Sequence, residues 1–181
     1  MLFLLEGCID VANGTSGDFS VITSFNENGR LVYFKRFNDI SQTEQINFLQ
    51  NLYKQYKNKI SVFNIESNNM GATFIDLLRS GGCFPDSFQT TAKTKRQLVE
   101  NFIVAIQKEK LSLPKIDTLI SEMQDFRVNF KIDGGVTFSS PSGKHDDIVM
   151  SLMIAWSGYQ KYHYFNDNVS SNGRQILYTI R

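Results

Sequence analysis

The stretch that most restricts the fold is a largely apolar run, residues 148–156, which directly follows Lys144, His145, Asp146 and Asp147. A helix made from this run is apolar on nearly every face, so it has to lie in the core of a domain. A buried helix needs only one N-terminal cap, and folding alone therefore does not explain two adjacent aspartates at its start. Two carboxylates in this place point to a metal ion.

Length and composition set the scale of the fold. A chain of 181 residues with 41% hydrophobic residues can bury a full core, and we expect residues 1–181 to form a single domain. Residues 1–5 lack the basic start of a signal peptide, and no segment approaches the roughly 18 apolar residues of a membrane span, so we expect a soluble protein. The formal net charge of +1 shows no basic excess, and any nucleic-acid site must come from local clusters of cations.

Hydrophobic periodicity and turn residues predict the order of the elements. Ser41 and Glu44 fit a capping box that opens the first helix. The apolar helix comes last and is followed by a polar tail. We expect strands over residues 2–11, 19–25, 31–37, 60–65 and 88–91, helices over 70–79, from 93 to before Pro114 and over 116–126, a hairpin of 127–133 with 136–140, an irregular tail over 165–173, and an edge strand that 175–180 could add.

The element order predicts the fold class. The first three strands read as an antiparallel meander, and the later elements alternate between strand and helix. This order predicts an α/β fold in which helices cover both faces of a central sheet of mixed direction. Functional residues in such sheets collect at the carboxyl ends of strands, where Asp10 and Glu66 are expected.

Asp10, Glu66, Asp146 and Asp147 therefore form a candidate set of metal ligands. Hydrolysis of a phosphodiester with Mg2+ or Mn2+ needs carboxylate oxygens from several elements, because two ions activate the water and stabilise the leaving oxygen. Each acid also has an ordinary explanation when taken alone. Asp10 could cap a turn, Glu66 could be an exposed acid after a strand, and the aspartate pair could be a cap with a neighbour that complements the helix dipole.

Three motifs carry a resemblance that covers most of the chain in the same order. They are Asp10-Val-Ala-Asn-Gly-Thr-Ser-Gly-Asp18, Ile65-Glu66-Ser-Asn-Asn-Met-Gly71, and Ser140-Pro-Ser-Gly-Lys-His145-Asp146-Asp147. Together they resemble the nuclease domain of the large terminase subunit of tailed bacteriophages. The resemblance implies a ribonuclease H-like fold with a β-hairpin near the active site.

The resemblance also implies roles for the acids. In that family, an acid on the first strand, an acid after a later strand and an acid that opens the last helix bind two divalent ions. Asp10, Glu66 and Asp146 with Asp147 match these positions, so the resemblance implies that they are catalytic and hold two Mg2+ or Mn2+ ions. It leaves open which of the two aspartates is the direct ligand. Asp18 matches a further acid of the first motif, which helps to orient the ligands or the loop.

Function and partners are likewise implied by the resemblance. The expected activity is that of a divalent-metal-dependent DNA endonuclease that cuts concatemeric viral DNA during genome packaging in the host cytoplasm. Expected partners are double-stranded DNA and the ATPase domain, portal and small terminase subunit of a packaging motor, with no membrane. The chain has no GxxxxGK[ST] phosphate-binding loop, so we expect the nuclease domain without the ATPase domain.

Other polar residues near these motifs are candidates for auxiliary roles. His145 either positions a water or phosphate or caps its loop, and Lys144 precedes it. Three cations at the start of the helix that begins near residue 93 oppose the helix dipole, which favours contact with DNA phosphates, although a solvated helix start explains them equally simply. The candidate DNA-binding residues are Lys93, Lys95, Arg96, Arg127 and Lys131.

Two other classes of function stay open. Another ribonuclease H-like nuclease, such as a junction resolvase or a transposase, uses the same acids, and a non-catalytic module that binds DNA or docks on a motor keeps the fold without turnover. Two hydrolase classes are disfavoured. A His-Asp phosphohydrolase needs more histidines than His145 and His163 supply, and a Ser-His-Asp hydrolase needs a GxSxG elbow that the chain lacks.

Overall fold

A five-stranded sheet of mixed direction forms the centre of the molecule. The computed structural model describes residues 5–10, 19–68, 71–132 and 134–171. The strand order is β3-β2-β1-β4-β5; β1, β2 and β3 pair antiparallel, whereas β4 is parallel to both β1 and β5. The bounds are β1 (Leu5–Asp10), β2 (Ser20–Phe25), β3 (Leu31–Phe37), β4 (Ile60–Glu66) and β5 (Asp86–Phe88).

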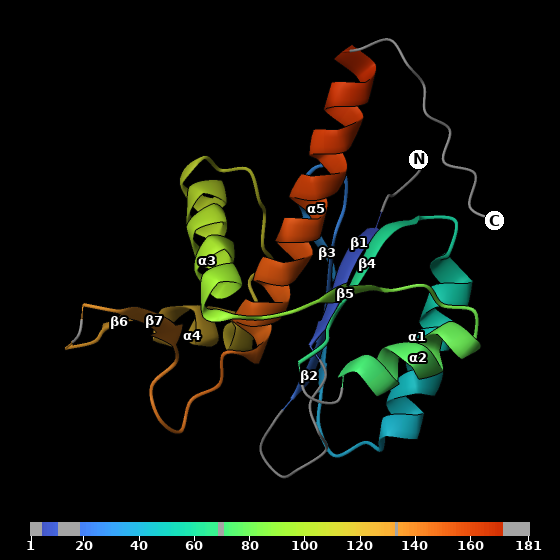
Figure 1. Ribbon diagram of the computed structural model, residues 1–181, viewed down its shortest axis with the longest axis horizontal. Helices are drawn as coiled ribbons and strands as arrows, with labels where there is room; N and C mark the ends of the chain where they lie inside the picture. Colours follow the sequence, from blue (N-terminus) through green and yellow to red (C-terminus); the bar gives the residue numbers. More distant parts are fainter. Residues whose placement is uncertain (1–4, 11–18, 69–70, 133, 172–181) are drawn as a thin grey trace.

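Helices cover both faces of this sheet, as Figure 1 shows. The helices α1 (Gln42–Tyr56) and α2 (Gly71–Ser80) lie on one face, and α3 (Ala92–Gln107), α4 (Asp117–Asp125) and α5 (Asp147–Ser171) lie on the other. A separate two-stranded hairpin, β6 (Arg127–Phe130) with β7 (Val136–Ser139), joins α4 to α5. Within the described residues, no helix is long and apolar enough to cross a membrane.

Alternation along the strands produces two hydrophobic cores. Val21 and Phe25 of β2 pack with α5, whereas Ile22 between them packs with α1 and α2. Because both sides of the sheet are covered, β2 is buried along its whole length. The apolar helix α5 is buried at every position from Ile148 to Trp156, including the polar Ser151, and it crosses β1, β2 and β4.

Most of the expected elements are confirmed, including the meander and the capping box. Ser41 and Glu44 bond reciprocally at the start of α1. The strand expected over residues 88–91 is displaced, since β5 ends at Phe88. Thr91 serves as the N-cap of α3 and not as a strand residue, because its side chain accepts from the backbone N–H of Thr94.

The tail prediction was wrong for residues 165–171. There α5 continues without interruption to Ser171 instead of becoming irregular. The segment is polar but contains neither proline nor glycine, so nothing interrupts the backbone hydrogen bonds of a helix that is already formed. The edge strand expected over residues 175–180 lies outside the described residues.

Gly29 at the β2–β3 turn permits a test of local strain. Its φ is +70°, and a Cβ at this position would collide with the carbonyl oxygen of Lys110 and lie 3.3 Å from the Trp156 ring. We expect Gly29→Ala to lower the free energy of unfolding by about 3 kcal/mol, from strain plus overpacking. Gly82→Ala is the matched control, because Gly82 has a φ of +83° and open space around a Cβ. Equal losses in urea denaturation of the two variants would contradict the steric part of this prediction.

Candidate metal centre

The register of two parallel strands brings Asp10 and Glu66 to the same edge of the sheet. Asp10 ends β1 and Glu66 ends β4. Ile9 is in register with Ile65, so the two acidic positions are neighbours one step further along. The carboxyl ends of adjacent parallel strands therefore present both acidic positions together, as the sequence predicts.

Strand alternation assigns Glu66 to the face that α5 covers. Position 10 is paired with Val21, which belongs to the core beneath α5. Ile65 belongs to the opposite core beneath α1 and α2, so Glu66, the next residue, falls on the α5 face.

The first turn of α5 approaches the same edge. The Ser151 hydroxyl donates to the Val21 carbonyl at 3.3 Å and lies 2.8 Å from Thr23 Oγ1. Asp147 lies one turn earlier on the same side of the helix, and its carboxylate accepts from the backbone N–H of Phe19. Three segments distant in sequence thus place Asp10, Glu66 and Asp147 toward one end of the sheet.

The carboxylate of Asp147 is partly buried, and one of its oxygens lacks a hydrogen-bond donor among the described residues. Burial raises the pKa of its carboxyl group and Asp146 adds to this rise, whereas His145 and the Phe19 N–H act in the opposite sense. Its Oδ2 is buried, lies 3.5 Å from His145 Nδ1, and has no hydrogen-bond partner among the described residues. A buried carboxylate oxygen without a donor suits a divalent cation.

Asp146 pairs with a lysine of α3. Its carboxylate Oδ2 lies 3.1 Å from Lys95 Nζ, and its carbonyl accepts the Met150 N–H at 2.8 Å as the helix N-cap does. The adjacent aspartates therefore have different partners. Lys95, a candidate for DNA binding, therefore lies beside a candidate metal ligand.

Glu66 is oriented by its own loop. Asn68 Nδ2 donates to Glu66 Oε1 at 3.1 Å and to the Thr90 carbonyl at 2.9 Å. The backbone N–H of Thr90 donates in return to Asn68 Oδ1 at 3.2 Å. The amide of Asn68 thus ties the end of β4 to the segment that follows β5.

The donor set fits Mg2+ or Mn2+, because carboxylate oxygens are the ligands that these hard cations prefer. Among the side chains that the structure describes, no group of three acids, histidines or cysteines forms a complete metal cluster. The side chain of Asp10 is not among them, and Asp18 lies outside the described residues. The ligand assignment of Asp10, Glu66, Asp146 and Asp147 stays a prediction.

The other basic candidates have varied surroundings. Lys144 pairs with Asp125 at 3.1 Å, and Arg96 pairs with Glu100 at 2.8 Å along α3. Lys93 is exposed in the first turn of α3, and Arg127 and Lys131 are exposed on the hairpin. Their role in DNA binding stays a prediction.

Sequence reasoning missed Glu122 and Arg36. Glu122 is only 7% exposed; its Oε1 lies 3.0 Å from Arg36 Nη2, and its Oε2 accepts from the backbone N–H of Ile148 at 2.8 Å. Burial raises the pKa of Glu122, while the Ile148 N–H and Arg36 favour its ionised form. A signal was present in the sequence, since Glu122 follows the buried Leu119 by three residues on the apolar side of α4.

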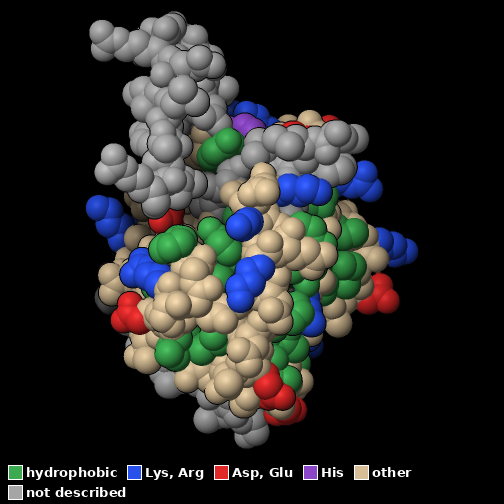
Figure 2. Space-filling view, turned by 90° about the vertical axis from the view of Figure 1, so that its right-hand side faces the viewer, with side chains coloured by type: hydrophobic (Ala, Val, Ile, Leu, Met, Phe, Trp, Pro, Cys, Tyr) green, Lys and Arg blue, Asp and Glu red, His purple; other side chains and the backbone are tan. Residues whose placement is uncertain are grey.

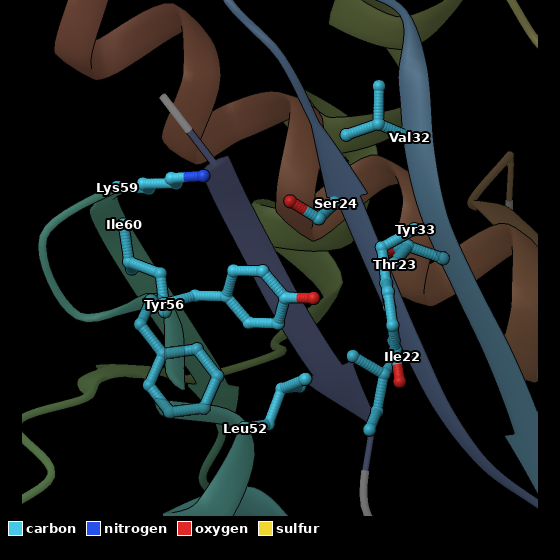
Figure 3. A pocket seen from close by; sticks show the side chains of 10 residues that line it. Ile22, Thr23, Ser24, Val32, Tyr33, Leu52, Tyr56, Lys59 and Ile60 are labelled. Carbon is cyan, nitrogen blue, oxygen red and sulfur yellow. The ribbon is translucent and has the colours of Figure 1, made fainter. Parts of the chain in front are cut away.

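A mainly apolar pocket lies elsewhere in the fold. A pocket of about 280 Å³ opens between α1 and the sheet, on the face opposite α5, and Figure 3 shows side chains of α1, β2, β3 and the start of β4 around it. Its lining is mainly apolar, which does not suit a phosphodiester. On the face shown in Figure 2, Lys and Arg side chains are dispersed among other residues and do not collect in one patch.

Comparisons with known proteins identify a family and several relatives. The family described as "Terminase RNaseH-like domain" matches residues 7–178. The large terminase subunit of Thermus virus P23-45 is 26% identical over 155 residues, which cover 84% of this chain, and that of Thermus phage G20c is 25% identical over the same length. The chain spans 32% of the length of these curated relatives.

Solved structures show the same fold. The large terminase nuclease of phage G20c with bound magnesium has a TM-score of 0.74 at 24% identity, covering 86% of this chain and 81% of that one. The nuclease domain of the large terminase subunit gp2 of bacterial virus Sf6 has a TM-score of 0.69 at 10% identity, covering 84% and 87%. The fold is a mixed α/β fold of the ribonuclease H type. Because the family match extends over residues 7–178, the chain belongs to the family of terminase RNaseH-like domains.

Proposed function

We propose that this chain is the nuclease domain of a terminase large subunit and cuts concatemeric viral DNA during genome packaging. The observation that carries the proposal is the meeting of three acidic segments, the ends of β1 and β4 and the first turn of α5, at one edge of the sheet. Related terminase nucleases have been solved with magnesium or manganese, which supports a divalent metal here.

Asp10, Glu66 and the pair Asp146 and Asp147 are the residues that would hold two Mg2+ or Mn2+ ions. When bound, such ions activate the attacking water and stabilise the leaving oxygen. The chain itself contributes fixed carboxylates, because Asn68 orients Glu66 and the Phe19 N–H orients Asp147. Asp18 and His145 are auxiliary candidates that help to order the loop or a water beside these acids.

The hairpin and α3 form the proposed approach for double-stranded DNA. The Ser140 hydroxyl, just after β7, donates to the His145 carbonyl at 2.8 Å and so ties the hairpin to the segment that carries the aspartates. Lys93, Lys95, Arg96, Arg127, Lys131 and Lys144 would then contact phosphates on either side of the acids. In the host cytoplasm the domain would work with an ATPase domain, a portal and a small terminase subunit.

Removal of metal tests this function directly. We expect the chain to nick supercoiled plasmid in Mn2+ or Mg2+ and to lose this activity completely in EDTA, because the carboxylates alone supply no activated water. Agarose-gel conversion of supercoiled to open-circular DNA measures the result. Cleavage that persists in EDTA, or the absence of cleavage in every divalent metal, would contradict the proposal, and the second result favours a non-catalytic docking module.

The choice of DNA substrate separates the other rival. A terminase nuclease is expected to cut linear and supercoiled duplexes without a requirement for a branch, whereas a junction resolvase prefers a four-way junction. The measurement is the ratio of initial cleavage rates on a four-way junction and on a linear duplex of the same sequence. A strong preference for the junction would reassign the domain to the resolvase class.

A further inference from the structure

The ion pair of Glu122 and Arg36 links three elements around the start of α5. A carboxylate is almost never as buried as Glu122 unless it has partners. Glu122 belongs to α4 and Arg36 belongs to β3. Glu122 also accepts a hydrogen bond from the backbone N–H of Ile148, the second residue of α5. The pair therefore joins a helix, a strand and the helix terminus that carries two candidate ligands.

Glu122 acts as a helix cap supplied from outside the helix. The first N–H groups of a helix lack partners within the helix, and the side chain of the cap residue commonly binds one of them. Here the Asp146 carboxylate is directed to Lys95, and the Asp147 carboxylate accepts from Phe19. An external acceptor for Ile148 leaves both aspartates available for another partner.

Arg36 contacts Phe19, whose backbone N–H donates to the Asp147 carboxylate. Its guanidinium lies 3.5 Å above the centre of the Phe19 ring, and that ring meets the His145 ring edge-on at 5.1 Å. The Phe19 N–H donates to the Asp147 carboxylate, and Ile148, which follows Asp147, donates its N–H to Glu122. The pair of Arg36 and Glu122 therefore contacts Phe19 through Arg36 and Ile148 through Glu122.

We propose that Glu122, with Arg36 as its counterion, is a positioning residue that fixes the first turn of α5 so that the carboxylates of Asp146 and Asp147 can bind divalent metal. This inference rests on the proposed function, in which these aspartates are ligands. Outer residues that orient metal ligands typically contribute 10–100-fold to metal affinity.

The test compares three variants with the wild-type chain. Glu122→Leu keeps the approximate volume but cannot accept from Ile148, whereas Glu122→Gln keeps an oxygen acceptor. Leu119→Ala is the control, because Leu119 is a buried residue of the same helix and its loss destabilises the core without removing the cap. For each chain, the half-saturating Mn2+ concentration is measured from the rise in Tm with added Mn2+ and, separately, from plasmid nicking.

We expect Glu122→Leu to raise the half-saturating Mn2+ concentration about 10–100-fold in both measurements. Glu122→Gln should restore most of the wild-type value, and Leu119→Ala should lower Tm while leaving the Mn2+ concentration unchanged. A wild-type Mn2+ response in Glu122→Leu, or an equal shift in Leu119→Ala, overturns the inference. If Glu122→Leu does not fold, the double variant R36M/E122L repeats the comparison without an unpaired arginine.

The two measurements separate this inference from the proposed function. A wild-type chain that cuts DNA, with an unaltered Mn2+ response in Glu122→Leu, overturns the positioning role alone. A wild-type chain whose Tm rises with Mn2+ but which cuts no DNA overturns the nuclease function, and the Tm data then decide the positioning role. A Tm that does not respond to Mn2+ overturns both.

Discussion

Replacing Asp10 by Asn is expected to abolish plasmid nicking in Mn2+, with a loss of at least about 100-fold, while binding to duplex DNA persists. Asparagine has nearly the same size as aspartate but no negative charge, so it holds a divalent cation poorly. The loss should exceed that caused by removing a residue that only orients a ligand, which is about 10–100-fold. Initial nicking rates measure the first effect, and fluorescence anisotropy with a labelled duplex measures the second.

Asp76→Asn is the matched control for this change. Asp76 is exposed on α2, across the sheet from α5, and its carboxylate lies 3.8 Å from Arg79. The same chemical change at this position should leave nicking and duplex binding unaltered. Equal cleavage by Asp10→Asn and the wild-type chain would remove the proposed metal centre.

Trp156→Ala is expected to produce the largest loss of stability, about 4 kcal/mol of the free energy of unfolding. Trp156 is 1% exposed, and its ring meets Phe25 edge-on at 5.5 Å and stacks on Tyr159 at 4.5 Å. Alanine would leave a cavity where α5 crosses the end of β2, in an interior that cannot collapse to fill it. The midpoint of urea denaturation, at an unchanged m-value, measures the loss.

Trp156→Phe is the control, with an expected loss below about 1.5 kcal/mol because most of the volume is kept. The indole Nε1 has no hydrogen-bond partner among the described residues, so this change breaks no recorded bond. Trp156 lies nine residues from Asp147, about 13 Å along the helix. The Mn2+ concentration for half-maximal nicking by Trp156→Ala, measured well below its Tm, should therefore equal that of wild type; a raised value would contradict this separation.

The periodicity of the sequence was sufficient for most of the elements. The β2–β3 turn at Gly29, the capping box of Ser41 and Glu44, and the buried helix that begins at Asp147 all depend on residues close together in the chain. Local sequence patterns predicted the bounds of an element less well where two neighbouring elements could use the same residues. Thr91 became a cap instead of a strand residue, and the polar end of α5 stayed helical because helix ends are not set by polarity alone.

For the site, residue type and local position identified Asp10, Glu66, Asp146 and Asp147 as candidates, because strand ends and helix starts are properties of short segments. The sequence by itself could not determine the register of β1 against β4, the different partners of the two aspartates, or the pairing of Glu122 with Arg36. These depend on contacts between residues far apart in the chain, such as Arg36 and Glu122, which are 86 residues apart. Only tertiary packing decides which of many polar side chains become partners, since hydrogen bonds and ion pairs require distances of about 3 Å that spacing along the chain does not encode.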